Sequence, residues 1–340
     1  MYATVMHAPG DVRYENVDDP KILKPTDAII KLSATCICGS DLWPYRGHNK
    51  FDAPLHMGHE YCGVVVEVGS EVRSVRPGQF VVGSFCLSDN TCPHCQYGFQ
   101  SSCVQREIMT GAQAPYARVP LADGTLVATQ EMPDDAMIGH MLAVSDVLGT
   151  GWFGAVAADV REGGTVVVVG DGAVGLMGVM AAQQMGAGRI IAMSRHDSRT
   201  ALAREFGATD IVAARGEDGI GEVLELTDGV GADSVIEAVG MEQSMAQAVG
   251  VCRPGGSIGY VGVPHGVSFD GLQLFLRQQR MLGGPAPVRR FLPDLMNRVL
   301  EGRIAPGKVF DQVLPIAEVA EGYKAMDERR AIKTMLRVDG

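Results

Sequence analysis

The sequence predicts an α/β chain with two domains: an irregular, mostly antiparallel β-domain, followed by a doubly wound parallel sheet. The chain has 340 residues, which is too long for one ordinary hydrophobic core. Its first 145 residues carry short β-type runs that are broken by Gly, Pro and Asp. From about residue 150, buried-looking strands alternate with helical stretches. Alternation of this kind is typical of a parallel sheet with helices on both faces.

Each expected element follows from a short sequence pattern. The strand-like runs of the first domain are DAIIKLSATC at 27–36, YCGVVVEVGSEV at 61–72 and QFVVGSF at 79–85. In the second domain we expect strands at 165–170, 189–194, 233–239 and 256–263, and helices at 173–185 and 198–207. The end of the chain predicts a helix, RRFLPDLMNRVLEG at 289–302, and a closing strand, AIKTMLRV at 331–338.

Composition and charge exclude several classes of partner. The chain is 46% apolar, and its 43 glycines occur without any low-complexity run, which is typical of many tight turns in a globular protein. A formal charge of −11 disfavours a phosphate backbone or an anionic membrane as partner. We therefore expect a small-molecule ligand, with no nucleic acid and no membrane.

The N-terminus and the cysteines predict a cytoplasmic protein. The opening MYATVMHAPGDVRYENV has no basic segment followed by an apolar run, and no stretch of the chain reaches the length that spans a bilayer. In a reducing compartment, the eight cysteines are interpreted as metal ligands or buried thiols before disulfides.

Gly170, Gly172 and Gly175 form a GxGxxG pattern directly after a predicted strand and at the start of a predicted helix. Glycines at these positions let the backbone turn and approach a pyrophosphate, while the helix N-terminus offers free N–H groups and the positive end of its dipole. The alternative is a glycine-rich turn with no ligand. In this strand-to-helix context the pattern favours a dinucleotide-binding site.

The residues after the second of these strands predict which dinucleotide is bound. A site for NAD carries an acidic residue about twenty positions after the glycines, where it binds the ribose hydroxyls. Here that strand ends in Met193, Ser194, Arg195 and His196. The hydroxyl of Ser194 and the guanidinium of Arg195 can bind a 2′-phosphate through charge-assisted hydrogen bonds. We therefore expect NADP(H), with His196 and Arg199 also among the cofactor-binding residues.

A second interpretation of this segment remains open. Arg195 and Arg199 would then form a solvated helix face, and Asp197 would bind the ribose in their place. The cofactor expected under that interpretation is NAD(H).

Cys38 and His59 have the chemistry of metal ligands. Cys38 lies in CICGSDLW and His59 in GHEYCGVVVEVGSEV, and a thiolate with an imidazole suits zinc. Glu60, beside His59, is either a further ligand or a carboxylate next to the ligands. Taken alone, a Cys and a His about twenty residues apart are more often core residues than ligands.

The stretch CLSDNTCPHCQYGFQSSC holds four cysteines between Cys86 and Cys103. Cys92, Cys95 and Cys103 are separated by two and by seven residues, a spacing that is too regular for chance. The residue three positions before Cys92, which would extend that spacing, is Asp89. Either this stretch is a metal site with one unusual ligand, or it is not a metal site.

In order and spacing, these motifs resemble the alcohol dehydrogenase type of the zinc-dependent medium-chain dehydrogenase/reductase superfamily. The stretch GHEYCGVVVEVGSEV fits that family's zinc signature, with Gly58, His59, Glu60, Gly63 and Gly69 in register. The CGSD segment, the cysteine-rich lobe, the GxGxxG pattern and the later GATD follow in the family's order. The resemblance therefore covers essentially the whole chain.

The resemblance implies the domain organisation and the cofactors. A GroES-like, mostly-β catalytic domain would cover residues 1–150 and be completed by residues 288–340, and a Rossmann dinucleotide-binding domain would cover residues 151–287. The expected cofactors are NADP(H), a catalytic zinc and a structural zinc. The expected assembly is a homotetramer, built from dimers that join their cofactor-domain sheets edge to edge.

Carried over residue by residue, the resemblance implies that Cys38 and His59 are ligands of the catalytic zinc, with Glu60 as an alternative ligand. The next ligand in the family is a Cys or an Asp just before a Thr-Gly pair, and in LAVSDVLGTGWFGA that residue is Asp146. Three protein ligands leave the fourth position for water or substrate, which is the open geometry that a catalytic zinc requires.

Ser40 matches the family's hydroxyl that hydrogen-bonds the reacting oxygen and begins a proton relay. Where several relatives have a relay histidine three residues later, this chain has Trp43. Protons are then expected to leave either through ribose hydroxyls and water or through His48. Trp43 and Phe85 are expected to line the substrate pocket.

The resemblance also assigns residues to the cofactor. Thr150 and Val174 match positions that flank the nicotinamide, where Val174 presses it toward the substrate. Lys333 matches a basic position near the C-terminus that lies close to the cofactor's phosphates in some relatives.

The family's structural zinc has four ligands separated by two, two and seven residues, and this register selects Asp89, Cys92, Cys95 and Cys103. A carboxylate is a legitimate zinc ligand, so a site with three sulfurs and one oxygen remains tetrahedral. Cys86 falls outside the register, on the side of the substrate pocket. Two alternatives stay open: Cys86 returns as the fourth ligand, or the lobe has lost its metal.

Together these residues imply an NADP(H)-dependent zinc oxidoreductase that interconverts an alcohol with an aldehyde or a ketone. A rival function is the metal-free NADPH-dependent quinone or enone reductase of the same superfamily, which lacks the set Cys38, His59 and Asp146. Another is a nucleotide-binding protein without turnover, which an intact Ser40 and an open zinc site disfavour. The motifs do not encode the identity of the substrate, because scattered pocket residues decide it.

Overall fold

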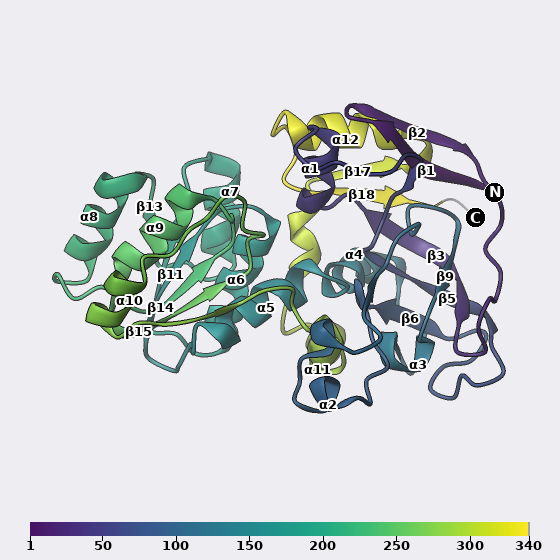
Figure 1. Ribbon diagram of the computed structural model, residues 1–340, viewed down its shortest axis with the longest axis horizontal. Coiled ribbons are helices and arrows are strands. Elements are labelled where there is room, and N and C mark those ends of the chain that lie inside the picture. Colours follow the sequence, from purple (N-terminus) through teal and green to yellow (C-terminus); the bar gives the residue numbers. More distant parts are fainter. Residues whose placement is uncertain (339–340) are drawn as a thin grey trace. The chain divides into compact units, whose positions relative to one another are not determined.

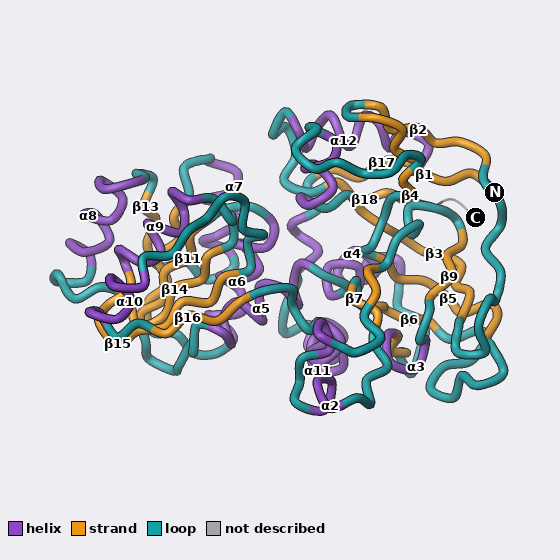
Figure 2. The backbone as a smooth tube through the Cα atoms, viewed as in Figure 1, coloured by secondary structure: helices purple, strands orange, loops and turns teal. Residues whose placement is uncertain are grey.

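The computed structural model describes residues 1–338, and the chain divides into two compact units (Figure 1). The first unit comprises Met1–Asp146 with Pro287–Gly340, and the second comprises Val147–Ala286. The predicted fold class is confirmed, because the first unit is built mainly from antiparallel strands and the second around a parallel sheet. Figure 2 shows the strands of the second unit side by side, with helices around them.

The chain begins with a small antiparallel sheet in the order β2-β1-β4. Its strands are β1 (Tyr2–Ala8), β2 (Asp11–Asn16) and β4 (Leu55–His56). The turn between β1 and β2 places Gly10 at a φ of 74°, a backbone conformation that favours glycine. The residues in the middle of β1 are buried, so this sheet packs against the rest of the unit.

The main sheet of the first unit has the strand order β10-β6-β5-β3-β18-β17, with β9 also pairing with β3. Its strands are β3 (Ala28–Cys36), β5 (Tyr61–Val68), β6 (Phe80–Gly83), β9 (Tyr116–Val119), β10 (Leu126–Ala128), β17 (Gln312–Pro315) and β18 (Thr334–Arg337). The last strand, β18, pairs with β3 through Met335 and Cys36, so the end of the chain returns to the sheet formed by its beginning.

The pairing of β3 with β5 decides where the candidate metal ligands lie. These strands are antiparallel, and Thr35 near the end of β3 is the partner of Tyr61 at the start of β5. The residues just after β3 and just before β5 are therefore neighbours. Beneath them, a hydrophobic core that includes Ile30, Leu32 and Val65 holds the two strands in register.

Short helices and one small ribbon complete the first unit. The ribbon pairs β7 (Cys86–Leu87) with β8 (Glu107–Ile108). The α-helices are α1 (Leu42–Tyr45), α2 (Pro93–Gln96), α3 (Ala122–Thr125), α4 (Asp135–Val144), α11 (Val288–Leu300) and α12 (Val319–Asp327). The 3-10 turns are η1 (Gly39–Asp41), η2 (Gln100–Ser102), η3 (Pro306–Val309) and η4 (Ile316–Glu318).

The second unit is built on a sheet of six parallel strands in the order β13-β12-β11-β14-β15-β16. The strands are β11 (Thr165–Val169), β12 (Arg189–Met193), β13 (Asp210–Val212), β14 (Ala232–Glu237), β15 (Cys252–Tyr260) and β16 (Arg280–Gly283). The first strand of this unit, β11, lies in the middle of the sheet, and the next two, β12 and β13, extend the sheet to one edge. The chain then crosses to the other side of β11, where it forms β14, β15 and β16. The carboxyl ends of strands at such a switch point are where open α/β sheets bind ligands.

Helices cover both faces of this sheet. They are α5 (Val147–Ala157), α6 (Ala173–Gln184), α7 (Asp197–Glu205), α8 (Gly216–Leu226), α9 (Glu242–Val251) and α10 (Gly271–Arg277). Val167 packs in one core with residues of α8 and α9, while Val168 faces the opposite side, next to Gly178 of α6. Among residues 1–338, no helix combines the length and apolarity needed to cross a bilayer.

Candidate metal and cofactor sites

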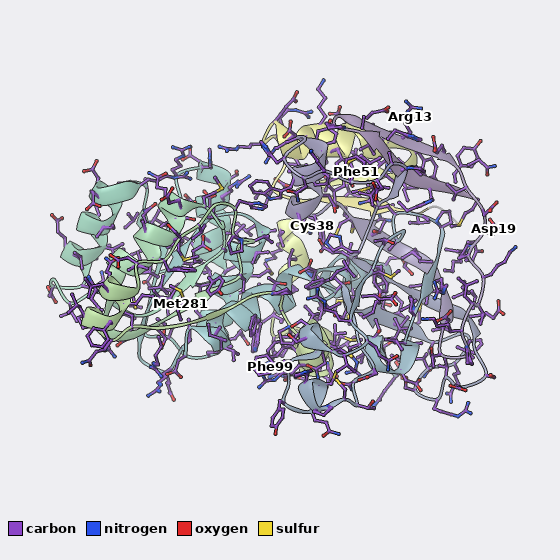
Figure 3. All side chains as sticks on the ribbon, in the orientation of Figure 1. Arg13, Asp19, Cys38, Phe51, Phe99 and Met281 are labelled. Atoms are coloured by element: carbon purple, nitrogen blue, oxygen red, sulfur yellow. The ribbon has the colours of Figure 1, made fainter. Side chains whose placement is uncertain are left out.

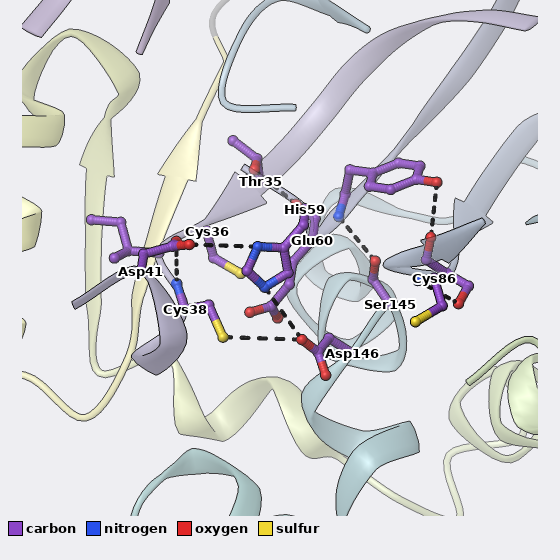
Figure 4. Close-up of polar contacts among 12 residues, drawn as sticks. Thr35, Cys36, Cys38, Asp41, His59, Glu60, Cys86, Ser145 and Asp146 are labelled. Atoms are coloured by element: carbon purple, nitrogen blue, oxygen red, sulfur yellow. Dashed lines mark hydrogen bonds and ion pairs between the residues drawn. The ribbon is translucent and has the colours of Figure 1, made fainter. Parts of the chain in front are cut away.

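Four side chains from three distant segments of the chain meet beside the end of β3 and the start of β5, in the main sheet of the first unit. Cys38 (labelled in Figure 3) follows β3, His59 and Glu60 precede β5, and Asp146 follows α4. One ligand atom of each of these residues lies within 4.8 Å of the others. Figure 4 shows Cys38, His59 and Asp146 pointing toward one another, with Glu60 beside them. The structure therefore brings together the set that the sequence singled out, although its members are up to 108 positions apart.

The spacing of these atoms fits a zinc ion. His59 Nε2 lies 3.5 Å from Asp146 Oδ2, and Cys38 Sγ lies 4.0 Å from the same oxygen. Ligands bound tetrahedrally at about 2.0 to 2.3 Å from zinc are roughly 3.3 to 3.8 Å apart. Thiolate, imidazole and carboxylate are also the ligand types that zinc accepts. The donor set can hold this metal without a large rearrangement.

Asp41 is a functional residue that the sequence reasoning missed. Its Oδ1 lies 3.5 Å from His59 Nδ1, and its Oδ2 accepts a hydrogen bond of 3.0 Å from the amide of Cys38. This carboxylate orients the imidazole so that Nε2 faces Asp146, an arrangement common around metal-binding histidines. Burial lowers the pKa of His59, but Asp41 and Cys38 outweigh it and raise that pKa well above its usual range. The cluster therefore favours a positive charge at its centre.

Asp41 belongs to the CGSD segment, so its position was visible, but its role was not. Its second partner comes from α12, where the hydroxyl of Tyr323 lies 3.5 Å from Asp41 Oδ2 and 3.3 Å from Gln113 Oε1. Tyr323 is fully buried. Only the fold reveals that a residue 282 positions away supports the carboxylate that orients His59.

Ser145 fixes the segment that carries Asp146. Its hydroxyl donates to the carbonyl of Gly83 at 2.6 Å and accepts from the amide of Tyr61 at 3.0 Å, and all of these groups are buried. This serine thus ties the end of α4 to β5 and β6, next to the ligand. No motif in the sequence indicated this role, because a single serine between two apolar helices carries no signal of its own.

Lys333 has a different partner from the one expected. It was predicted to lie near the cofactor's phosphates, but its Nζ lies 2.7 Å from Glu60 Oε1 and donates to the carbonyl of Ile37 at 3.2 Å. Both side chains of this ion pair are buried. A buried ammonium needs a partner of opposite charge, and Glu60 supplies it. The structure therefore assigns Lys333 to the surroundings of the metal cluster.

The ion pair with Lys333 uses only one of the two carboxylate oxygens of Glu60. Its Oε2 is buried and has no hydrogen-bond partner in the described part of the chain. An unsatisfied carboxylate oxygen is costly in a buried site, and a metal ion beside it would remove that cost. This observation fits the expectation that Glu60 is an alternative zinc ligand.

The other residues predicted around this cluster lie close to it in the chain or in space. Ser40 is exposed and lies in η1, two positions after Cys38. The ring of Phe85 lies 6.2 Å from the ring of His59, so it borders the cluster. Trp43 lies in α1 with its ring 5.3 Å from that of His48. The roles of these four residues in a proton relay or a substrate pocket stay predictions.

Cys92, Cys95 and Cys103 converge in the lobe formed by α2 and η2. Cys92 Sγ lies 3.5 Å from Cys95 Sγ and 3.9 Å from Cys103 Sγ, and all three cysteines are free. Cys103 Sγ accepts hydrogen bonds of 3.3 Å from the amides of Asp89 and Gln105. Burial raises the pKa of the Cys103 thiol, and these two amide hydrogen bonds offset part of that rise by stabilising the thiolate, which is the form that binds metal.

The structure groups Asp89 with the three lobe thiols and leaves Cys86 outside that group. Asp89 Oδ1 accepts from the amides of Thr91 and Cys92 at 2.8 and 2.9 Å. Burial raises the pKa of Asp89, but these amide hydrogen bonds outweigh it and hold that pKa well below its usual range. Cys86 lies in β7, where burial raises the pKa of its thiol to about 12. The geometry favours Asp89 as the fourth ligand.

Two alanine variants separate the assignments of the lobe. We expect Asp89→Ala to lose about one zinc per chain, because three sulfurs then leave one position of the closed tetrahedron open. Cys86→Ala should keep the metal, and Asp89→Cys should keep it as well. Zinc per chain, measured by elemental analysis, decides the question. Metal loss in Cys86→Ala but not in Asp89→Ala would assign the fourth position to Cys86.

The glycine loop between β11 and α6 has the shape that a dinucleotide needs. A Cβ at Gly175 would lie 2.0 Å from the carbonyl oxygen of Gly170, so only glycine fits there. A Cβ at Gly172 would meet nothing within 4 Å, so open space lies beside this residue at the N-terminus of α6. Free N–H groups facing open space at a helix N-terminus suit a pyrophosphate. Residues of this unit therefore fit the predicted cofactor.

Predicted cofactor residues also lie on α5 and α6, which pack against each other: a Cβ at Gly151 of α5 would lie 2.6 Å from the amide of Gly178 of α6. Thr150 lies in α5 and is buried, and Val174 lies in the first turn of α6 and is partly buried. The expectation that they flank the nicotinamide stays a prediction.

At the end of β12 the structure differs in part from both sequence interpretations. Arg195 is exposed, and His196 is the residue before α7. Arg199, however, is not a solvated side chain, because its Nη1 lies 3.2 Å from the carboxylate of Asp171. Ser194 is buried, and its hydroxyl donates to the same carboxylate at 3.1 Å. Asp171 lies between two glycines of the fingerprint and was not expected to have a role.

Comparison with known proteins agrees with this geometry. Residues 24–134 match the family described as "Alcohol dehydrogenase GroES-like domain", and residues 173–299 match "Zinc-binding dehydrogenase". The first match includes all the candidate metal ligands except Asp146, and the second begins just after Gly172 and includes Gly175 of the glycine loop. The fold and the metal cluster therefore define a two-domain, zinc-dependent oxidoreductase.

Individual relatives extend over nearly the whole chain. A probable zinc-binding alcohol dehydrogenase of Mycobacterium tuberculosis is 35% identical over 95% of this chain and 84% of its own. An NADP-dependent isopropanol dehydrogenase of Clostridium beijerinckii is 35% identical over 89% and 88%. The solved structure of the alcohol dehydrogenase TADH from Thermus sp. ATN1 is 30% identical, covers both chains fully and superposes with a TM-score of 0.92. The chain belongs to the zinc-dependent alcohol dehydrogenase family.

Proposed function

We propose that this chain is an NADP(H)-dependent alcohol dehydrogenase, which interconverts an alcohol with an aldehyde or a ketone at a zinc site formed by Cys38, His59 and Asp146. The observation that carries the proposal is the convergence of these three side chains, with atoms 3.5 and 4.0 Å apart around one point. Three ligands of these types leave one coordination position for the substrate oxygen.

The chemistry divides between the metal and the chain. A zinc ion bound here supplies Lewis acidity, which makes an alcohol easier to deprotonate and a carbonyl easier to reduce. The exposed hydroxyl of Ser40, two residues after Cys38, accepts the proton from the substrate hydroxyl and passes it to water, ribose hydroxyls or His48. Asp41 holds His59 in the tautomer that leaves Nε2 free to bind the metal.

The second unit binds the nucleotide that exchanges hydride with the carbinol carbon. The open space beside Gly172 accepts the pyrophosphate, and Thr150 and Val174 hold the nicotinamide ring. Arg195 supports NADP(H), because its exposed guanidinium follows β12, where the chain has Met193 in place of an acid. Similarity to the relative from Clostridium beijerinckii, which is named as NADP-dependent, also supports NADP(H) as the cofactor.

The proposed lobe metal is structural. A zinc ion held by Asp89, Cys92, Cys95 and Cys103 has four protein ligands, so it has no open position for a substrate.

Both rival functions predict a different metal content or activity. A metal-free enone reductase would not need the Cys38 cluster, and a protein without turnover would bind NADP(H) and leave carbonyls unchanged.

The test is a zinc assay combined with turnover. We expect about two zinc ions per chain and reduction of simple aldehydes or ketones with NADPH in preference to NADH. A panel of primary, secondary, polyol and aromatic alcohols with NADP+ then defines the substrate class. Reduction of an enone C=C bond by protein stripped of zinc would support the reductase alternative. Binding of NADPH without any turnover would support the non-catalytic one.

We also propose that the protein is a cytoplasmic homotetramer. The eight cysteines are all free, which suits a reducing compartment. On the second unit, β16 ends the sheet with Met281 (labelled in Figure 3) on this edge strand, and Leu272, Phe275 and Leu276 of α10 are exposed. Exposed apolar side chains beside a sheet edge favour contact with a second copy. The mass in solution tests the proposal, and a monomer would contradict it.

A further inference from the structure

Asp171 occupies the point where the chain would meet the cofactor's adenosine ribose. It follows β11 by two residues, and Ser194 follows β12 by one. These two parallel strands are neighbours, and Val169 is paired with Met193, so Asp171 and Ser194 lie at the same carboxyl edge of the sheet. In doubly wound folds this edge holds the ribose of the nucleotide.

The Asp171 carboxylate is bound to two residues that were expected to bind the cofactor, one of them, Ser194, through a 2′-phosphate. Its Oδ1 lies 3.2 Å from Arg199 Nη1, and its Oδ2 accepts from the Ser194 hydroxyl at 3.1 Å. The side chains of Asp171 and Arg199 are only 9% and 16% exposed, so this pair is shielded from water. The Ser194 hydroxyl also lies 3.1 Å from Thr200 Oγ1. Ser194 and Arg199 are thus held by an acid in place of a phosphate.

A carboxylate at this position acts on the cofactor in two opposite ways. It can accept a hydrogen bond from a ribose 2′-hydroxyl, which is the function of the acid that NAD sites carry at the end of the second strand. It also repels a 2′-phosphate and offsets the charge of Arg199, which would otherwise attract one. The chain therefore carries the acid in its glycine loop, although the end of β12 lacks it.

We propose that Asp171 is a specificity-determining residue, which restrains the preference for NADP(H) and lets the enzyme use NAD(H) as a second cofactor. The inference rests on the proposed nucleotide-binding function of this unit. Arg195 provides the attraction for a 2′-phosphate, and Asp171 opposes it. The preference between the two cofactors is then set by the balance of these two side chains.

The substitution Asp171→Asn tests this balance, because it keeps the size of the side chain and removes its charge. We expect affinity for 2′-phosphorylated ligands to rise about tenfold and affinity for ligands with a free 2′-hydroxyl to fall several-fold. Calorimetry on the full-length zinc protein, with 2′-phospho-ADP-ribose and ADP-ribose as probes, measures both without any turnover. The values of kcat/KM for NADP+ and NAD+ should move in the same two directions.

Three further variants make the outcome decisive. Asp218→Asn removes an exposed acid from the first turn of α8 and should leave both affinities unchanged. Arg195→Ala should weaken only the 2′-phosphorylated probe, which tests the proposed NADP(H) preference by itself. Arg199→Gln, which leaves the Asp171 charge unmatched, should lower affinity for the 2′-phosphorylated probe and so provides a second test if Asp171→Asn does not fold.

Each result has a defined meaning. Opposite shifts for the two probes in Asp171→Asn support the inference, because a merely structural role would weaken both. Equal losses for both probes, or no change in their ratio, would overturn it. If Arg195→Ala leaves the 2′-phosphorylated probe unaffected while Asp171→Asn shifts the ratio, the proposed role of Arg195 fails and that of Asp171 stands. A parent protein that binds neither probe would overturn both.

Discussion

Replacing Cys38 with serine should abolish most of the activity and remove one zinc ion per chain. Cys38 supplies the only sulfur in the cluster with His59, Glu60 and Asp146, and removing one of three protein ligands leaves too few to hold a metal at an open site. Zinc contributes several kcal/mol to such reactions, and each 1.4 kcal/mol is tenfold in rate, so we expect kcat/KM to fall at least about 10³-fold.

A matched control isolates the metal effect. Cys62 is also a buried free cysteine near the start of β5, but it belongs to neither metal group, and its Sγ lies 3.9 Å from the carbonyl of Ile138. Cys62→Ser should therefore keep about two zinc ions and the parent's turnover. Elemental analysis and steady-state kinetics measure both variants. If Cys38→Ser retained the parent's zinc content and its rate, the catalytic assignment of this cluster would be wrong.

The metal ligands could be predicted because metal chemistry restricts residue types and spacing. Cys38 and His59 were proposed from their residue types, Asp146 was implied by the family resemblance, and the structure brings their atoms together. The residues that support them were not found, because hydroxyls and carboxylates occur everywhere in a sequence. Ser145 acts through contacts with β5 and β6, and Tyr323 through a contact 282 positions away. Such roles depend on tertiary packing, which local patterns do not encode.

For the fold as well, local patterns predicted some features, while others depend on tertiary packing. The alternation of apolar runs and helical stretches after residue 150 predicted a parallel sheet, and six parallel strands are present in the second unit. The predicted closing strand at 331–338 also exists as β18, but its pairing with β3 joins residues about 300 positions apart. The short elements α2, α3 and η2 were not predicted, because helices of three or four residues have too few side chains to show a period.

Asp171 lies within the GxGxxG pattern, but the pattern did not reveal its contacts. The GxGxxG pattern fixes the glycines and leaves the intervening positions free, so the sequence indicated nothing about the side chain between Gly170 and Gly172. The fold directs that side chain to the end of β12, where it meets Ser194 and Arg199. The cofactor argument from the sequence considered the groups after β12 and omitted the acid that faces them.

The substitution Lys333→Met is expected to destabilise the protein strongly. The Lys333 ammonium and the Glu60 carboxylate are 2.7 Å apart, with side-chain exposures of 1% and 0%. Removing one member of a buried ion pair leaves the other charge unmatched, which costs about 3–5 kcal/mol in the free energy of unfolding. Methionine fills much of the same volume, so the loss reflects the missing charge more than a cavity. Equilibrium unfolding of the zinc-loaded protein in urea measures the effect.

The control is the same substitution at an exposed lysine. Lys324 of α12 has a side chain that is 60% exposed and lies 4.0 Å from Glu328, and an exposed pair of this kind contributes less than about 1 kcal/mol. Combining Glu60→Gln with Lys333→Met removes both charges and should restore part of the lost stability, since the two side chains are coupled. Were Lys333→Met no less stable than Lys324→Met, the Glu60–Lys333 contact would not be a significant ion pair.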